Sequence, residues 1–214
     1  MNGTSCPIPD RETCYRIMVD TAMMEHIAAH SIQVCRVAAT LADLLADRGI
    51  ILNRSLVVAG ALLHDITKSR SIETGENHAA TGSEFVRSLG YPEVSRVVAQ
   101  HVRLVEQADG TPVREEEIVH YADKRVIHTR IGSLADRLRY IMARYGTDRN
   151  RRNMIRSLFR QCLRVEERLF SHLDCTPEDL ADLVFPVEQA RELAAYRDMY
   201  HKSVRERDSA PGEP

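Results

Sequence analysis

The chain has 214 residues and a net charge of −2; 43% of its residues are hydrophobic and 28% are charged. These values are ordinary for a globular protein, and the length allows one sizeable core. Only 5% of the residues are aromatic and Trp is absent, so the sequence gives no strong signal for a basic, base-stacking nucleic-acid surface.

The cysteines and the N-terminal segment predict a cytoplasmic protein without a membrane anchor. No apolar run approaches the length of a membrane span. The segment Met1–Cys6 lacks the basic start and apolar core of a secretory signal. The five Cys residues are odd in number and form no CxxC pair, so we expect reduced, buried or incidental thiols rather than a disulfide or zinc-finger framework.

Hydrophobic periodicity predicts an all-α fold with no strand. Asp10 and Asn53 are predicted helix caps, and Gly49 is the predicted stop of the second helix. Residues 66–76 are polar, contain one Gly and predict a loop. In chain order, the predicted helices span about residues 10–23, 24–48, 54–64, 77–89, 93–105, 112–127, 133–145, 148–173 and 186–205.

The second half of the chain carries further helix signals. Thr111 is predicted to cap a helix whose first residue is Pro112. The segments Ser133–Asp136 and Thr176–Asp179 each read as a capping box. The helix at residues 148–173 has Arg at every fourth position, which indicates a solvated face; a docking surface for an acidic partner or a second subunit is the alternative. This stripe is formed by Arg152, Arg156, Arg160, Arg164 and Arg168.

The stretch Ala61–Lys68 reads Ala-Leu-Leu-His-Asp-Ile-Thr-Lys, an apolar run that ends in the adjacent pair His64 and Asp65. A buried carboxylate beside an imidazole is costly unless something compensates both groups, and a metal ion would bind both. Because this dipeptide is common, other polar residues on apolar helix faces decide what it means.

Further His and Asp residues fall on apolar faces or at the starts of other predicted helices. The candidate metal ligands are His30, His64, Asp65, His78, His101 and Asp123. Four imidazoles and two carboxylates suit iron, manganese, zinc or cobalt better than calcium. Six side chains are too many for one catalytic metal with an open position, and they fit two neighbouring ions.

This order of residues resembles the HD superfamily of metal-dependent phosphohydrolases, and specifically its HDIG-type members. The family pattern H…HD…H…H…D falls on the six candidate ligands. Leu-Leu-His-Asp-Ile-Thr-Lys matches the HDIGK core except that Thr67 stands where Gly is usual, and His30-Ser31-Ile32-Gln33-Val34 resembles the first-His helix. The resemblance covers about residues 25–130. It implies an HD-type helical bundle whose metal centre lies between helices, with Asp65 bridging two ions.

The resemblance and the helix pattern together predict the division of the chain. We expect an N-terminal segment and helix at residues 1–24 and an HD-type metal-binding domain at residues 25–130. A C-terminal helical extension, packed on the same domain, is expected at residues 131–207. Residues 208–214 are predicted to form a disordered tail.

The function that follows is metal-dependent hydrolysis of a small phosphate ester, such as a nucleotide or dinucleotide, by two divalent or mixed-valence transition-metal ions. Asp65 and Lys68 are the candidate catalytic residues. Lys68, Arg103 and Lys124 are the candidate substrate-binding residues, and Arg125 is a further candidate, because cationic side chains stabilise phosphoryl charge.

Several nearby residues resemble functional ones without being assigned the same role. Gly90-Tyr91-Pro92 spells the GYP of the HD-GYP cyclic-dinucleotide phosphodiesterases, but it precedes His101 and the HHExxDGxGYP run is missing, so that substrate is not carried over. His26 and His120, each one turn before a candidate ligand, are expected to support the ligands or face solvent. Glu76 is a competitor of His78.

Two other functions stay open from the sequence. Some HD relatives use the same ligand order as di-iron oxygenases of small organic substrates. A non-catalytic signalling or scaffold module is the third reading, and the complete ligand set argues against it. The sequence does not name the substrate, the native metal or the oligomeric state, so a homo-oligomer also stays open.

Overall fold

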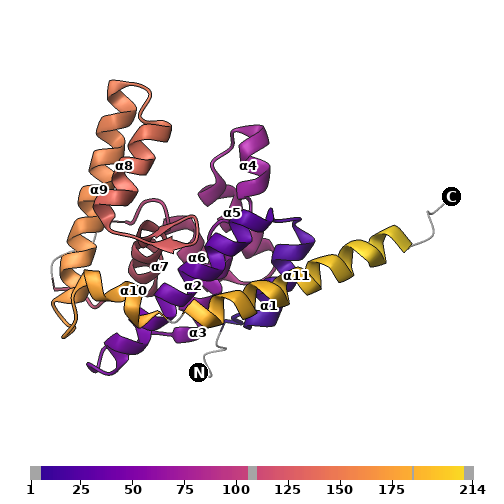
Figure 1. Cartoon of the computed structure of the whole chain (residues 1–214), viewed down its shortest axis with the longest axis horizontal. Helices are drawn as coiled ribbons and strands as arrows, with labels where there is room; N and C mark the ends of the chain where they lie inside the picture. The colour runs from indigo at the N-terminus through magenta and orange to yellow at the C-terminus, as the bar shows by residue number, and fades with distance from the viewer. Residues whose placement is uncertain (1–5, 106–109, 185, 210–214) are drawn as a thin grey trace.

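The computed structural model describes residues 6–105, 110–184 and 186–209, and nearly all of its regular elements are helices (Figure 1). The predicted all-α class is therefore confirmed. The helices are α1 (Arg11–Asp20), α2 (Glu25–Ala46), α3 (Arg54–Leu63), α4 (Lys68–Thr74), α5 (His78–Ser88), α6 (Pro92–Gln100), α7 (Glu115–Arg125), α8 (Leu134–Tyr145), α9 (Arg149–Phe170), α10 (Leu180–Leu183) and α11 (Pro186–Ser209), with a 3₁₀ turn η1 (Pro177–Asp179) before α10.

Helix α2 is the central element of the molecule. It packs against α3, α7 and α11, and residues on all of its faces are buried, from Ile27 to Leu45. A helix that is buried all round belongs to the core of the fold. Its small Ala residues let the neighbouring helices approach closely, and its polar His30 is therefore carried into the interior.

Helix α3 crosses α6 at very short range because Gly60 has no side chain. A Cβ at this position would meet Cγ1 of Val97 at 2.5 Å. The Asn53 side chain caps α3 by accepting a hydrogen bond from the backbone N–H of Leu56, as predicted. The residues that directly follow α3 and α6, His64 and His101, are thereby brought into one region of the core.

The region predicted as a loop at residues 66–76 contains a short helix, so that prediction is wrong. Helix α4 has no buried residue, and a helix without a buried stripe leaves no hydrophobic period in the sequence. Its end is marked by Gly75, which adopts a left-handed backbone with φ 74°.

The expectation of no strand is also incorrect at one small place. Val126–Ile127 (β1) and Arg130–Ile131 (β2) pair as an antiparallel hairpin, where the sequence predicted the end of a helix. His128, with φ 57°, supplies the left-handed backbone that a two-residue hairpin loop needs. Helix α7 therefore ends at Arg125, and the first strand of the hairpin takes the place of the last predicted helical residues.

Helix α7 begins later than the turn signals predicted. Its N-cap is Arg114 rather than Thr111, because the Glu117 carboxylate accepts a hydrogen bond from the Arg114 backbone N–H. Val105, predicted to face the core after α6, is 65% exposed. Asp109, part of the predicted turn, lies outside the described residues.

The helices after the hairpin pack back onto the central ones. Helices α8 and α9 form an antiparallel pair that rises beside α7 in Figure 1, and α11 runs along α1 and α2 before projecting past them. The Ser133–Asp136 and Thr176–Asp179 capping boxes are both present, as predicted. Helix α11 continues to Ser209, so the predicted disordered tail begins too early; residues 210–214 lie outside the described residues.

Two further expectations can be compared with the structure. Among the described helices, none combines the length and the apolar character that crossing a lipid bilayer requires. All five Cys residues are free thiols, and Cys14, Cys35 and Cys162 are buried.

Candidate metal centre

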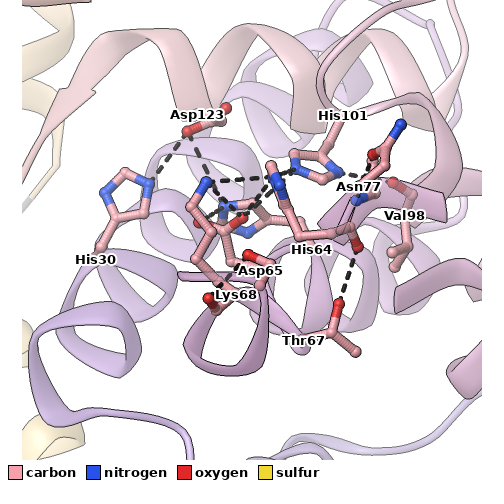
Figure 2. A network of polar contacts seen from close by, with 12 residues as sticks. His30, His64, Asp65, Thr67, Lys68, Asn77, Val98, His101 and Asp123 are labelled. Atoms are coloured by element: carbon pink, nitrogen blue, oxygen red, sulfur yellow. Dashed lines mark hydrogen bonds and ion pairs between the residues drawn. The ribbon is translucent and has the colours of Figure 1, made fainter. Parts of the chain in front are cut away.

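All six candidate ligands meet at one place in the core, although they come from five segments of the chain. His30 lies on α2, His64 and Asp65 directly follow α3, and Asp123 lies near the end of α7. His78 is the first residue of α5, and His101 is the residue after α6. In Figure 2, Asp65 lies at the centre, with His30 and Asp123 on one side of it and His101 on the other.

Two groups of ligand atoms overlap at Asp65. Among the described residues, His30, His64 and Asp65 form one group whose ligand atoms all lie within 4.8 Å of one another, and Asp65, His78 and His101 form the second. Asp65 Oδ2 lies 3.5 Å from His64 Nε2, and Oδ1 lies 3.2 Å from His78 Nε2. The two oxygens of one carboxylate therefore face two different imidazole groups.

Backbone carbonyls fix the orientation of three imidazoles. Nδ1 of His30 lies 2.9 Å from the His128 carbonyl, and Nδ1 of His64 and of His101 lie 2.7 Å from carbonyls one turn earlier in their own helices. An Nδ1–H that donates to a carbonyl leaves Nε2 as the lone-pair nitrogen. All three Nε2 atoms then point into the cluster, which is the arrangement of metal-binding histidines.

Several polar atoms of the cluster are buried without a hydrogen-bond partner. Within the described part of the chain, His64 Nε2 and Asp65 Oδ1 are two of them. His78 Nε2 and His101 Nε2 lie only 3.1 Å apart. Buried polar groups without partners are unfavourable. A cation between these atoms removes this penalty, so the residues present fit a metal site.

Charges in the cluster shift several pKa values. Burial alone would raise the pKa of Asp65, but in the ion-free protein the charge of a doubly protonated His64 holds it well below its usual range. A metal at His64 Nε2 would supply that positive charge in place of the proton. Burial also opposes the shift at Asp123, whose pKa is held well below its usual range by the ammonium of Lys124. Burial lowers the pKa of His101 to about 4. Two carboxylates are thus ionised and one imidazole is neutral near pH 7, the forms that bind metals.

Helix ends add a favourable field. The C-termini of α3 and α6 point at the cluster, since His64 and His101 are the residues that cap them. The C-terminal end of a helix carries a partial negative charge from its free carbonyls. This field favours a cation in the cluster.

Lys124 and His120 hold the carbonyl of His101. The Lys124 ammonium donates to this carbonyl at 2.6 Å and to Asp123 Oδ2 at 2.7 Å. His120, which is fully buried, approaches the same carbonyl with Nδ1 at 2.9 Å. His120 thus contacts the backbone of the ligand His101 and is not itself in either group of ligand atoms, which agrees with the supporting role expected for it.

His78 is positioned by Thr67, the residue that replaces the usual Gly of the HDIGK core. The Thr67 hydroxyl donates to the His78 carbonyl at 3.0 Å and lies 2.9 Å from the hydroxyl of Thr81. Thr67 has φ −101°, so this backbone does not require Gly. Glu76, expected as a competitor of His78, pairs instead with Arg70 at 2.6 Å.

A cavity of about 750 Å³ opens over the cluster, and its lining contains cations from three elements. Lys68 lies 3.7 Å from Asp65 Oδ1 and 3.2 Å from His78 Nε2. Arg137 of α8 lies 3.4 Å from Asp123 Oδ1, and its side chain is 14% exposed. Lys124 and Arg144 also line the cavity. Arg137 was not among the residues predicted from the sequence, because only the packing of α8 on α7 brings it to the cluster.

Other sequence candidates lie elsewhere. Arg103 is exposed and is not among the described residues that line the cavity. Arg125 is buried and donates to the carbonyls of Gly132 and Pro177, which ties the hairpin and η1 to α7. His26 is exposed, lines the cavity and belongs to neither group of ligand atoms.

Three relatives show partial similarity to the chain. It is 34% identical over 142 residues to a tRNA (cytidine(56)-2′-O)-methyltransferase of Picrophilus torridus, a match that covers 59% of this chain and 39% of the relative. It is 30% identical over 135 residues to an uncharacterized protein of Methanocaldococcus jannaschii, covering 57% and 79%. It is 33% identical over 113 residues to a dihydroneopterin 2′,3′-cyclic phosphate phosphodiesterase of the same organism, covering 44% and 43%.

These matches leave large parts of the two enzymes uncovered, since the chain spans about two fifths of each. No solved structure gives a significant match to the chain. A family model described as HD domain matches residues 27–141, more than half of the chain, and this range contains all six candidate ligands. The chain therefore belongs to the HD-domain family of metal-dependent phosphohydrolases.

Proposed function

We propose that this protein hydrolyses a small phosphate ester, of the nucleotide or dinucleotide type, at a binuclear metal centre bridged by Asp65. The observation that carries the proposal is the pair of ligand groups that share Asp65. His30, His64 and Asp123 would hold one ion, and His78 and His101 the other. When bound, such ions lower the pKa of water and offset charge on phosphoryl oxygens.

The chain's own cations support phosphate binding. Lys68 and Arg137 both line the cavity, next to Asp65 and Asp123 respectively. The Arg137 side chain lines the cavity and carries five N–H donors, one of which bonds Asp123 Oδ1, so the guanidinium can also bind a phosphoryl oxygen. Lys124 already donates to the His101 carbonyl and to Asp123, so we assign it the positioning of these ligands.

The substrate class is supported by one relative whose name specifies its reaction. The phosphodiesterase of Methanocaldococcus jannaschii acts, by its name, on a cyclic phosphate ester. We carry over only the phosphate ester, because the chain covers less than half of that enzyme. The cations around the cluster favour the same class over an uncharged organic substrate.

The test is metal content together with phosphate-ester hydrolysis. We expect about two transition-metal ions per chain in protein purified without chelator, and metal-dependent hydrolysis of a panel of phosphomonoesters and cyclic phosphodiesters. Asp65→Asn should lose both, because the amide bridges two cations poorly. Asp47→Asn, at an exposed aspartate after α2, is the matched control and should keep both.

Two results would count against the proposal. Two ions per chain without hydrolysis of any ester, but with oxygen uptake by the iron-loaded form, would support the oxygenase instead. A protein that takes up no metal, and whose properties are unchanged in Asp65→Asn, would support a scaffold function.

A further inference from the structure

The cavity over the ligand cluster is lined by two chemically different groups of residues. The first group, which we call the charged end, consists of the ligands with Lys68, Lys124 and Arg137. The second group, which we call the apolar end, comes from the α8–α9 pair and has Arg144 as its one cation among the described lining residues. Its other members are apolar or aromatic: Tyr140, Ile141, Tyr145, Ile155, Leu158 and Phe159. A ligand that fills the whole cavity must therefore be charged at one end and apolar at the other.

Helix α8 places these groups in order of distance from the metal cluster. Arg137, beside Asp123, is at the charged end. Tyr140 is about one turn further along the helix, roughly 4.5 Å along its axis. Arg144 and Tyr145 follow after about another turn and are exposed. If Arg137 binds the phosphate of a ligand, Tyr140 can therefore contact a group that a short linker joins to that phosphate.

The ring of Tyr140 is held in place by its neighbours. It is half-buried and lies edge-to-face with the His128 ring, with 5.2 Å between centroids. The Arg137 guanidinium carbon lies 5.7 Å from the centre of the Tyr140 ring. On α9, Ile155 and Phe159 line the same cavity and are buried. Tyr140, Ile155 and Phe159 thus form a packed aromatic and aliphatic part of the cavity wall.

We propose that this wall selects phosphate esters that carry a planar aromatic ring on a short linker, such as a nucleoside, and that the ring packs against Tyr140 between α8 and α9. The inference rests on the proposed function and names the substrate class of the same site. A planar ring covers apolar surface that an aliphatic phosphate leaves in water, and ring stacking adds attraction. Most of the wall lies beyond residue 141, outside the part of the chain that matches the family.

The experiment compares two ligands that differ only in the ring. Isothermal titration of the metal-loaded protein with the hydrolysis-resistant phosphonate analogues of adenosine 5′-monophosphate and of ribose 5-phosphate gives one Kd for each. We expect the adenosine compound to bind at least about tenfold more tightly, the lower range of measured stacking effects. In Tyr140→Leu this ratio should fall to near one while the Kd of the ribose 5-phosphate analogue stays the same.

Two further variants separate the ring from general effects. Tyr140→Phe keeps the ring and should keep the ratio. Tyr200→Leu removes a half-buried tyrosine of α11 that is outside the cavity lining, and it should also keep the ratio. Metal content and circular dichroism of each variant show that it is folded and loaded.

The outcomes distinguish this inference from the proposed function. Equal Kd values for the two ligands in the wild-type protein, or equal weakening of both in Tyr140→Leu, would overturn the aromatic wall while leaving a phosphate site in place. If neither compound nor inorganic phosphate binds the metal-loaded protein, the proposed function fails and the aromatic wall fails with it.

Discussion

Arg137 links the cavity to the ligand cluster at the scale of a single residue. Its guanidinium lies beside Asp123, and its side chain lines the cavity. We predict that Arg137→Met lowers kcat/KM for a phosphate ester by about 10²–10³-fold, the usual effect of removing one donor that stabilises developing charge. Steady-state kinetics on the metal-loaded protein measures this.

The control for Arg137 lies on the same helix. Arg139 is exposed and pairs with Asp136, so Arg139→Met should leave kcat/KM unchanged. Metal content should be the same in both variants and in the wild type. If Arg137→Met lost its metal, the role of Arg137 would be to hold Asp123 and not the phosphate.

His120 gives a prediction about pH. Burial lowers its pKa to about 3 in the folded protein, whereas an exposed histidine has a pKa of about 6.5. Below pH 6.5 the unfolded chain binds a proton that the folded chain does not. The free energy of unfolding of the metal-free protein should therefore fall by up to about 1.4 kcal/mol per pH unit from this residue as the pH is lowered.

The other histidines set the pH range of the measurement and supply its control. His101 contributes in the same direction down to its pKa of about 4. The pKa of His64 is raised by Asp65 against the opposing effect of burial, so its contribution changes above pH 6.5. Urea titrations between pH 4 and pH 6.5 give the free energy of unfolding at each pH. Its change per pH unit should be clearly smaller for His120→Asn than for the wild type. The same change in both would contradict a buried, neutral His120. His201→Asn, at an exposed site, should have no effect.

At the scale of elements, the helices that carry the candidate ligands were predictable because they are amphipathic or fully apolar. His30 and Asp123 lie on buried helix faces, and the sequence period shows this. Helix α4 was missed because it buries nothing. The start of α7 was misplaced because the bond between Glu117 and Arg114 outweighs the Thr111–Pro112 turn signal.

Thr67 connects two elements and yields the next prediction. Its hydroxyl ties the start of α4 to the start of α5, where His78 is the first residue. Thr67→Val keeps the shape but removes the donor, so His78 should lose part of its fixed position. We expect at least about a tenfold loss in the affinity for one metal ion, in the range seen for groups that orient ligands.

The Thr67 variant can be checked by metal titration with a competing chelator. Thr67→Ser keeps the hydroxyl and should retain both affinities. A uniform loss at both metal sites would show that Thr67 acts on the whole cluster rather than on His78. No loss in Thr67→Val would show that Asn77, which caps α5, positions His78 alone.

At the scale of the whole molecule, the sequence identifies the ligands but not the cavity. The six ligands are recognisable from their order and spacing along the sequence. Arg137 and Tyr140, by contrast, come near the cluster only because α8 packs on α7. Arg103 shows the converse, since nearness in sequence to His101 did not bring it into the cavity. The boundary at residue 130 stays a prediction; the family match itself continues to residue 141.

The metal should stabilise the whole fold, because its ligands join α2, α3, α5, α6 and α7. At a free metal concentration a hundredfold above Kd, binding to the native state alone adds about 2.7 kcal/mol. For a chain of this size that raises Tm by about 5–11 °C. Calorimetry of chelator-treated protein before and after metal is added measures the change. Asp65→Asn should show no such increase. An equal increase in Tm in this variant would mean that the metal binds elsewhere. No increase in Tm in the wild type would mean that the fold holds its buried histidines together without a metal ion.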